Sequence, residues 1–244
     1  MTGPILQVDA LVAGYEPGLS IVRGATMQAN AAEIVVILGP NGAGKSSLIK
    51  AIAGLVPVTS GSVALDGQEI TQVPAHQMVR RGLAFVPQTD NVFPLMSVQD
   101  NLRVSAGVLA RAEIAGRIDE MFQMFPDLAR QRRLPAGSLS GGQRQMLAAA
   151  RALIVRPRVL MLDEPSAGLS PKFVEMVFAQ LAEMRRAGLT IVLVEQNARA
   201  ALAIGDRAYV LVEGRVAHEG PAASLWHDPI IAELYLGQRK EGAR

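Results

Sequence analysis

Four runs of consecutive apolar residues lie at 34–38, 83–86, 159–162 and 191–194. A run without polar positions is typical of a parallel strand covered on both faces, so these segments predict the buried strands of an α/β sheet. Looser alternation at 5–12 and 21–27, with glycines and a proline between them, predicts two antiparallel strands joined by a turn. The segment 61–67 predicts a strand and a tight turn, and 209–217 predicts a hairpin around Glu213 and Gly214.

The middle of the chain has the periodicity of helices instead. Apolar residues recur at helical spacing at Val98, Leu102, Leu109, Ile114, Ile118, Met121, Phe122 and Phe125. Gly107 and Gly116 are expected to break or end these helices. Further helices are expected over 74–81, 143–155 and 171–188, and two short ones after the hairpin, before a frayed tail at 238–244. Because no strand is expected between 89 and 158, this stretch is predicted to be a helical insertion.

Composition narrows the class of protein. The 244 residues suffice for a substantial core, and 50% hydrophobic against 19% charged residues indicates a folded chain. The mean hydropathy of +0.24 is high, yet no run of about 18 apolar residues predicts a membrane span, so the apolar excess indicates buried strands and a partner surface. The N-terminus lacks the basic start and apolar stretch of a secretory signal. With a net charge of +2, scattered arginines and no cysteine, we expect no nucleic-acid binding, disulfide or thiol metal site.

One glycine-rich stretch follows the first apolar run and precedes a helical pattern. It comprises Gly39, Pro40, Asn41, Gly42, Ala43, Gly44, Lys45 and Ser46, followed by Ser47. The spacing fits G-x-x-x-x-G-K-[ST], in which backbone N–H groups surround phosphate, the lysine reaches the β- and γ-phosphates and the serine hydroxyl binds Mg²⁺. The positive end of the following helix attracts the same anion. A chance glycine turn before a helix is the alternative, but it does not account for every fixed position and both flanks.

Two further patterns carry chemistry that a phosphate site needs. Asp163 and Glu164 end an apolar strand, where Asp163 can hold Mg²⁺ through its water shell and Glu164 can act as a general base toward the attacking water. A carboxylate pair at a strand end can equally cap the next helix or form ion pairs. A helix with exposed backbone N–H groups begins at Ser140, Gly141, Gly142 and Gln143. This turn is either a second anion site or a plain helix N-cap.

Taken in this order, the phosphate loop, the Ser-Gly-Gly-Gln turn and the strand at 159–164 resemble the ATP-binding-cassette (ABC) ATPases over nearly the whole chain. The resemblance implies one P-loop NTPase domain of the α/β class. Its RecA-like core and antiparallel β subdomain would span about 1–88 and 159–237, its helical subdomain about 89–158, and its tail 238–244. The resemblance also implies ATP and Mg²⁺ as cofactors. Two cassettes, as a homo- or heterodimer, would pack head to tail, with each ATP between the phosphate loop of one and the Ser-Gly-Gly-Gln turn of the other.

The resemblance assigns further site residues. Gln88 matches the family's glutamine loop, which senses Mg²⁺ and the γ-phosphate and contacts the membrane partner. Tyr15 matches the aromatic residue that stacks on adenine, whereas the pattern alone also allows it to pack on its own hairpin. Residues 166–171 match the loop that crosses the dimer interface. The apolar residues at 92–96 fit a partner surface, although the pattern alone equally allows an ordinary packed loop.

The expected site divides into three groups. The residues expected to bind ATP are Tyr15, Gly39, Pro40, Asn41, Gly42, Ala43, Gly44, Lys45, Ser46, Ser47, Gln88 and Asp163, with Ser140, Gly141, Gly142 and Gln143 serving the partner's ATP. The residues expected to hold Mg²⁺ are Ser46, Gln88 and Asp163, and those expected to act in catalysis are Lys45, Glu164 and Gln196.

Two positions depart from the general family pattern. Gln196 stands where the family usually has a histidine that contacts the γ-phosphate, and Ser170 replaces the usual aspartate of the dimer-crossing loop. With Tyr235, Leu236 and Gly237, these departures resemble the ATPase subunits of branched-chain amino-acid importers (the Liv type), a branch shared with urea and short-amide importers. This implies an ATPase at the cytoplasmic face of the cell membrane, bound to transmembrane permease subunits and, through them, to a periplasmic-type substrate-binding protein. A soluble non-transport ABC ATPase is the alternative.

Overall fold

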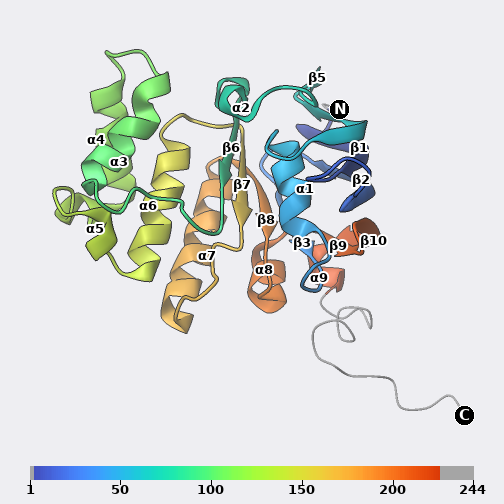
Figure 1. Cartoon of the computed structure of the whole chain (residues 1–244). Coiled ribbons are helices and arrows are strands. Elements are labelled where there is room, and N and C mark those ends of the chain that lie inside the picture. The colour runs from blue at the N-terminus through green and yellow to red at the C-terminus, as the bar shows by residue number, and fades with distance from the viewer. Residues whose placement is uncertain (1–2, 226–244) are drawn as a thin grey trace, which may run out of the picture.

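The computed structural model describes residues 3–225, and their centre is a mixed sheet with strand order β10-β9-β3-β8-β7-β6 (Figure 1). Its strands are β3 (Ile34–Leu38), β6 (Leu83–Val86), β7 (Val159–Asp163), β8 (Thr190–Val194), β9 (Arg207–Val212) and β10 (Arg215–Pro221). The four apolar runs become β3, β8, β7 and β6, which pair in parallel as the sequence predicted. The predicted hairpin forms β9 and β10, of which β9 is parallel to β3 and β10 antiparallel to β9.

A second sheet is antiparallel throughout. Its order is β2-β1-β4-β5, formed by β1 (Leu6–Ala13), β2 (Val22–Ala29), β4 (Val58–Leu65) and β5 (Gln68–Glu69). The predicted pairing of the two N-terminal strands and the predicted turn after 61–65 are therefore confirmed. The two sheets meet where the backbone N–H of Arg23 donates to the carbonyl of Gly214 at 2.8 Å.

Alternate residues of the central strands enter two separate apolar cores. Val35 and Ile37 of β3 pack with helix α1 (Lys45–Ile52) and the antiparallel sheet, so α1 lies between the two sheets (Figure 1). Val36 and Leu38 face the other side, toward α6 (Gly141–Leu153), α7 (Pro171–Arg186) and α8 (Ala198–Ile204). Burial on both faces explains why the interiors of these strands are apolar.

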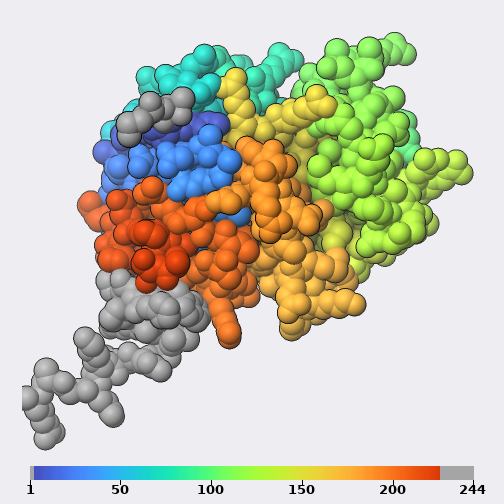
Figure 2. Space-filling model, turned by 180° about the vertical axis from the view of Figure 1, so that it is seen from behind, coloured from blue at the N-terminus to red at the C-terminus, as the bar shows by residue number. Residues whose placement is uncertain are grey.

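Only helices and turns lie between β6 and β7. They are α3 (Val98–Ser105), η1 (Ala106–Val108), α4 (Ile114–Met124), α5 (Pro126–Arg130), η2 (Ala136–Ser138) and α6, while α2 (Ala75–Arg81) precedes β6 and α9 (Ala222–Leu225) follows β10. Figures 1 and 2 show α3, α4 and α5, in green, projecting from one side of the molecule. The helix pattern predicted over 98–125 is therefore confirmed.

Three details of the helix prediction were wrong. Gly116 lies inside the first turn of α4 rather than at a break, since one helical glycine costs only about 1 kcal/mol and the packed face of α4 compensates. Helix α6 spans Gly141–Leu153 and so begins two residues before the expected range 143–155, because Ser140 caps it, in agreement with the expected helix start at Ser140. Helix α8 was not predicted. It is alanine-rich and lacks a clear apolar period, and its signal is the Asn197 side chain, which accepts from the Ala200 N–H at 3.2 Å.

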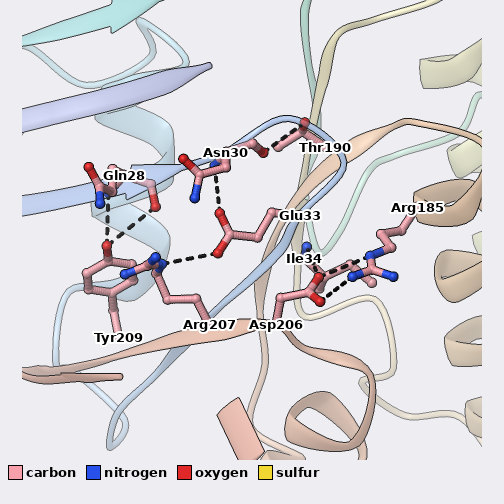
Figure 3. A network of polar contacts seen from close by, with 9 residues as sticks. All are labelled: Gln28, Asn30, Glu33, Ile34, Arg185, Thr190, Asp206, Arg207 and Tyr209. Carbon is pink, nitrogen blue, oxygen red and sulfur yellow. Dashed lines mark hydrogen bonds and ion pairs between the residues drawn. The ribbon is translucent and has the colours of Figure 1, made fainter. Parts of the chain in front are cut away.

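Polar contacts hold the amino ends of the central strands (Figure 3). The Glu33 carboxylate accepts from the backbone N–H of Asn30 at 2.6 Å and from Arg207 Nε at 3.1 Å. Asp206 accepts from the backbone N–H of Ile34 at 2.9 Å. These contacts fix β3 and β9 at the edge of the sheet opposite to their carboxyl ends.

Some segments about which the sequence makes predictions lie outside the described residues. Tyr235, Leu236 and Gly237, the tail at 238–244 and most of the two expected C-terminal helices lie outside the described residues. Within residues 3–225, no helix is both long and apolar enough to cross a membrane.

Candidate functional site

The glycine-rich loop connects the carboxyl end of β3 to the start of α1. Gly39 has a φ of 151°, and a Cβ there would lie 2.2 Å from the carbonyl oxygen of Leu211 in β9, so no side chain fits. Gly44 is the N-cap residue of α1. The turn between β9 and β10 supports the loop, because the backbone N–H of Gly214 donates to the carbonyl of Ala43 at 2.9 Å. The sequence predicted the loop, and the structure supplies this support from a distant hairpin.

A cleft of about 280 Å³ lies against this loop. It is lined by Ile21, Asn41, Gly42, Gly44, Lys45, Ser46, Ser47 and Glu164. Lys45 is almost fully buried, and its Nζ donates to the carbonyl oxygens of Gly39 at 2.9 Å and Pro40 at 3.1 Å. Burial lowers the pKa of Lys45, and the nearby carboxylates of Glu164 and Asp163 oppose this shift. A desolvated cation beside the N-terminus of α1 fits a phosphate group, which would replace the lost solvation.

Ser46 and Asp163 form a pair of oxygen ligands at the same edge of the sheet. The Ser46 hydroxyl donates to Asp163 Oδ1 at 2.9 Å. Burial raises the pKa of Asp163, against the opposing effect of this hydrogen bond. Within the described residues no group of three or more His, Cys, Asp or Glu side chains could hold a metal by itself. The pair fits Mg²⁺, which prefers hard oxygen ligands and commonly takes one or two from the protein and the rest from phosphate and water.

Glu164 is the meeting point of three segments that are far apart in the sequence. Gln88 Nε2, after β6, donates to Glu164 Oε2 at 2.8 Å. Gln196 Nε2, after β8, donates to both carboxylate oxygens of Glu164 at 2.9 Å. The backbone of Glu164 has a φ of 48°, which non-glycine residues seldom adopt. The structure therefore brings together the three residues that sequence reasoning had selected separately.

The other expected site residues lie elsewhere. Tyr15 is in the connection between β1 and β2 with 54% of its surface exposed, and it is not among the residues that line the cleft, although Ile21 of the same connection is. Ser140 caps α6 and forms a capping box with Gln143, with hydrogen bonds of 3.3 and 3.0 Å. The N-cap alternative for this turn is thus correct as a description of the single chain. None of the residues from Ser140 to Gln143 lines the cleft at the phosphate loop.

Sequence reasoning missed Glu195, the residue directly after β8. Glu195 is 1% exposed, and its carboxylate accepts from both the backbone N–H and the hydroxyl of Ser166 at 2.9 Å. It also accepts from the backbone N–H groups of Gln196 at 3.2 Å and Asn197 at 3.3 Å. Burial raises the pKa of Glu195, and these four hydrogen bonds oppose that shift. The available signal was its position, since a carboxylate follows an apolar strand here as Asp163 and Glu164 follow β7.

The segment after Gln88 carries an exposed apolar surface. Leu95 is 96% exposed, Phe93 42% and Met96 41%, which argues against the alternative of an ordinary packed loop. Arg151 of α6 supports the segment: its guanidinium lies 4.6 Å from the centroid of the Phe93 ring and donates to the carbonyl of Asn91. This surface is therefore attached to the helix that begins at Ser140.

Comparison with known proteins identifies relatives that match nearly the whole chain. Residues 22–167 match the family model described as "ABC transporter". The chain is 45% identical to the "Probable branched-chain amino acid transport ATP-binding protein LivF" of Archaeoglobus fulgidus, over 96% of this chain and 99% of that protein. It is 36% identical to the "High-affinity branched-chain amino acid transport ATP-binding protein BraG" of Pseudomonas aeruginosa, over 93% of this chain and 97% of that protein.

Solved structures show the same fold. The crystal structure of the ADP conformation of MJ1267, an ATP-binding cassette of an ABC transporter, matches with a TM-score of 0.85 and 26% identity, over 97% of this chain and all (100%) of that one. A dimeric structure of the cassette MJ0796, in a post-hydrolysis state with ADP and Pi, matches with a TM-score of 0.78 and 26% identity, over 89% of this chain and 98% of that one.

Proposed function

This chain belongs to the ABC transporter family of ATP-hydrolysing subunits, and we propose on that premise that it energises an importer of branched-chain amino acids. The observation that carries the proposal is the 45% identity, along almost the whole of both chains, to a protein named as a probable branched-chain amino acid transport subunit. Gln196 and Ser170, the departures from the general family pattern, agree with this branch.

The phosphate loop binds the triphosphate of ATP in this proposal. Backbone N–H groups from Asn41 to Ser47 and the N-terminus of α1 surround the phosphate oxygens, and Lys45 contacts the β- and γ-phosphates. Ser46, Asp163 and Gln88 would hold Mg²⁺, which supplies charge neutralisation on the β- and γ-phosphate oxygens when bound. Tyr15 stacks on the adenine ring, for which its exposed position in the connection before Ile21 gives support.

Glu164 acts as the general base of hydrolysis. Its carboxylate takes the proton of the attacking water as the water oxygen bonds to the γ-phosphorus and the bond to the β-phosphate oxygen breaks. Gln88 and Gln196 donate to this carboxylate in the structure, which supports a role for both in orienting it. Gln196 is a neutral donor, so its contact does not titrate between pH 5 and 8 as a histidine contact would.

A complete site needs a second cassette. The turn from Ser140 to Gln143 does not line the chain's own cleft, and a dimeric relative shares the fold, which together support a head-to-tail dimer. In this arrangement the backbone N–H groups beside Ser140 contact the γ-phosphate of ATP bound to the partner. The second cassette is either another copy of this chain, which gives a homodimer, or a different ATPase, which gives a heterodimer.

The exposed apolar surface after Gln88 contacts the permease. Phe93, Leu95 and Met96 lie on the segment that begins at Gln88, so a permease helix docked there would reach the catalytic carboxylate through one short connection. The protein would thus sit on the cytoplasmic face of the cell membrane as a peripheral subunit, served indirectly by a periplasmic-type substrate-binding protein.

Transport by the reconstituted complex tests this proposal. We expect vesicles that contain the chain, its permease and its substrate-binding protein to accumulate radiolabelled leucine in an ATP-dependent way, and Glu164→Gln to abolish the uptake. Uptake of radiolabelled urea without leucine would move the chain to the urea and short-amide branch. ATP hydrolysis without association with any membrane protein would favour a non-transport ABC ATPase.

A further inference from the structure

The buried carboxylate of Glu195 joins two loops that flank the catalytic residue. One oxygen, Oε1, accepts from the backbone N–H of Ser166 at 2.9 Å. The other, Oε2, accepts from the Ser166 hydroxyl at 2.9 Å and from the backbone N–H groups of Gln196 and Asn197 at 3.2 and 3.3 Å. Ser166 lies two residues after Glu164, in the loop that follows β7. Gln196 and Asn197 lie in the loop that follows the neighbouring strand β8.

Both loops contact Glu164, but of the two only the loop after β8 contacts its carboxylate. The carbonyl of Glu164 accepts from the backbone N–H of Ala167 at 3.1 Å, in the loop that Glu195 holds at Ser166. The Gln196 side chain donates to both oxygens of the Glu164 carboxylate at 2.9 Å. Gln196 is exposed, so packing against neighbouring side chains does little to hold it in position. Its backbone N–H donates to the Glu195 carboxylate, and this hydrogen bond holds it instead.

The contacts of Glu195 require a carboxylate. All four groups that contact the Glu195 carboxylate donate hydrogen bonds to its oxygens, and the carboxylate donates none. In a glutamine, an amide NH₂ at the Oε1 position would face the Ser166 N–H, and at the Oε2 position it would face the N–H groups of Gln196 and Asn197. Either orientation leaves a buried donor unpaired, so even this isosteric change displaces one of the two loops.

We propose that Glu195 is a positioning residue for hydrolysis, which holds Gln196 against Glu164 and ties Gln196 to the loop at 166–170. It contacts neither the phosphate loop nor the cleft, so it affects the reaction through Gln196 and not through ATP binding. The inference rests on the roles of Glu164 and Gln196 given under Proposed function, but not on the identity of the transported substrate.

The test is Glu195→Gln in the full chain, measured by ATP hydrolysis at a protein concentration where wild-type turnover has reached its plateau. We expect kcat to fall roughly tenfold, the effect of losing about one hydrogen bond, while the affinity for ATP stays within about twofold. In a Gln196→Ala background the same change is expected to lower kcat by less than about threefold, because the side chain through which it acts is already gone. A tenfold loss in both backgrounds, or equal losses of kcat and ATP affinity, would overturn the proposal.

Glu33→Gln is the matched control. Glu33 is also a buried glutamate next to a strand, with backbone and side-chain donors, but it lies at the amino end of β3, away from the site (Figure 3). We expect Glu33→Gln to alter thermal stability and to leave kcat unchanged. If Glu33→Gln lowers kcat as much as Glu195→Gln does, the effect of Glu195→Gln is one of stability and the proposal is wrong.

Two further variants keep the outcome decisive. Ser166→Ala removes only the hydroxyl bond to Glu195 and keeps the backbone bond, so it gives a folded protein with a smaller loss of kcat, about threefold, which vanishes in the Gln196→Ala background. A loss that persists in that background contradicts the proposal. Glu164→Gln distinguishes a failure of the proposed function from a failure of this inference. If Glu164→Gln retains activity, the assigned role of Glu164 is wrong. If Glu164→Gln is inactive while Glu195→Gln is fully active, only the role of Glu195 is wrong.

Discussion

At the scale of single residues, the site concentrates groups whose protonation is shifted by burial. The pKa of Asp163 is raised and that of Lys45 is lowered, and in each case burial is the largest cause. Each shift disfavours the charged form, although the site is expected to use the charged form of both. Binding of Mg²⁺ and phosphate would relieve this cost, so the nucleotide-free chain carries destabilising charges that its substrate compensates.

Glu164 and Gln196 differ in what they contribute. We expect Glu164→Gln to lower steady-state ATP hydrolysis by about 10²-fold or more, because the general base is lost. Gln196→Ala removes only donors to that base and should lower it about tenfold. Turnover rates of the two variants in the reconstituted complex check this, and equal losses would contradict the assigned roles.

Asp163 gives a prediction on stability. Because its pKa is raised, the folded chain holds the proton more tightly than the unfolded chain does. The ionised carboxylate is therefore little burden at low pH, below the ordinary aspartate pKa, and destabilises the fold increasingly as pH rises toward the raised value. Asp163→Asn removes this burden and keeps the oxygen that accepts from Ser46.

We expect Asp163→Asn to raise the Tm of the nucleotide-free chain at pH 8, by about 2–4 °C for each kcal/mol relieved, and by less at pH 4.5. The same variant should lose most of the increase in Tm that Mg-ATP gives the wild type. Thermal unfolding with and without Mg-ATP at both pH values measures both effects. A lower Tm at pH 8 without nucleotide would show that the carboxylate stabilises the fold.

At the scale of elements, the start of α6 combines structural and functional demands. The capping box of Ser140 and Gln143 satisfies the first turn of the helix. Gly142 lies against Phe173 of α7, and a Cβ there would come within 2.2 Å of the ring. At Gly141 a Cβ would lie 3.2 Å from its nearest neighbour, Leu169 Cδ2. The Phe173 ring therefore excludes a side chain at Gly142, whereas no comparably close contact excludes one at Gly141.

Gly141→Ala and Gly142→Ala form a matched pair that separates these reasons. We expect Gly142→Ala to lower the free energy of unfolding by about 1–3 kcal/mol, because Phe173 must move. Gly141→Ala should change it by less than about 0.5 kcal/mol. If the turn contacts the partner's γ-phosphate, Gly141→Ala still lowers ATP hydrolysis at least about tenfold, because its methyl group obstructs that contact. Urea unfolding and turnover assays measure these effects, and full activity of Gly141→Ala would argue against a phosphate contact.

At the scale of the whole molecule, the two half-sites that we propose do not meet within one chain. The cleft at the phosphate loop contains Glu164, whereas the Ser140 turn belongs to the helical part between β6 and β7. Our proposed division into a core at about 1–88 and 159–237 and a helical subdomain at about 89–158 places one half-site on each. Within the helical part, Arg151 of α6 donates to the carbonyl of Asn91, three residues after Gln88.

The purified chain should therefore bind ATP but turn it over slowly. We expect the specific ATPase activity to rise with protein concentration, because a second cassette completes each site. Glu164→Gln, which keeps the ATP contacts, should favour a stable ATP-bound dimer. Turnover measured across a dilution series tests this, and high activity with no dependence on concentration would contradict the half-site arrangement.

The sequence by itself determined the strands, the phosphate loop and the family. The central strands could be predicted because burial on both faces leaves only apolar residues, and the loop because its fixed glycines, lysine and serine are adjacent in the chain. Helix α8 was less predictable, because short helices depend on caps more than on apolar period.

Only the tertiary structure decided what surrounds the Glu164 carboxylate. Gln88, Glu164 and Gln196 meet because β6, β7 and β8 are parallel neighbours whose carboxyl ends share one edge of the sheet. From the sequence, Glu195 was interpreted only as the end of a strand. Its hydrogen bond with Ser166 forms because β7 pairs with β8. Hydrogen-bond partners far apart in the chain are set by strand order, which local patterns do not encode. The phosphate loop was therefore readable from sequence, whereas the network that orients Glu164 was not.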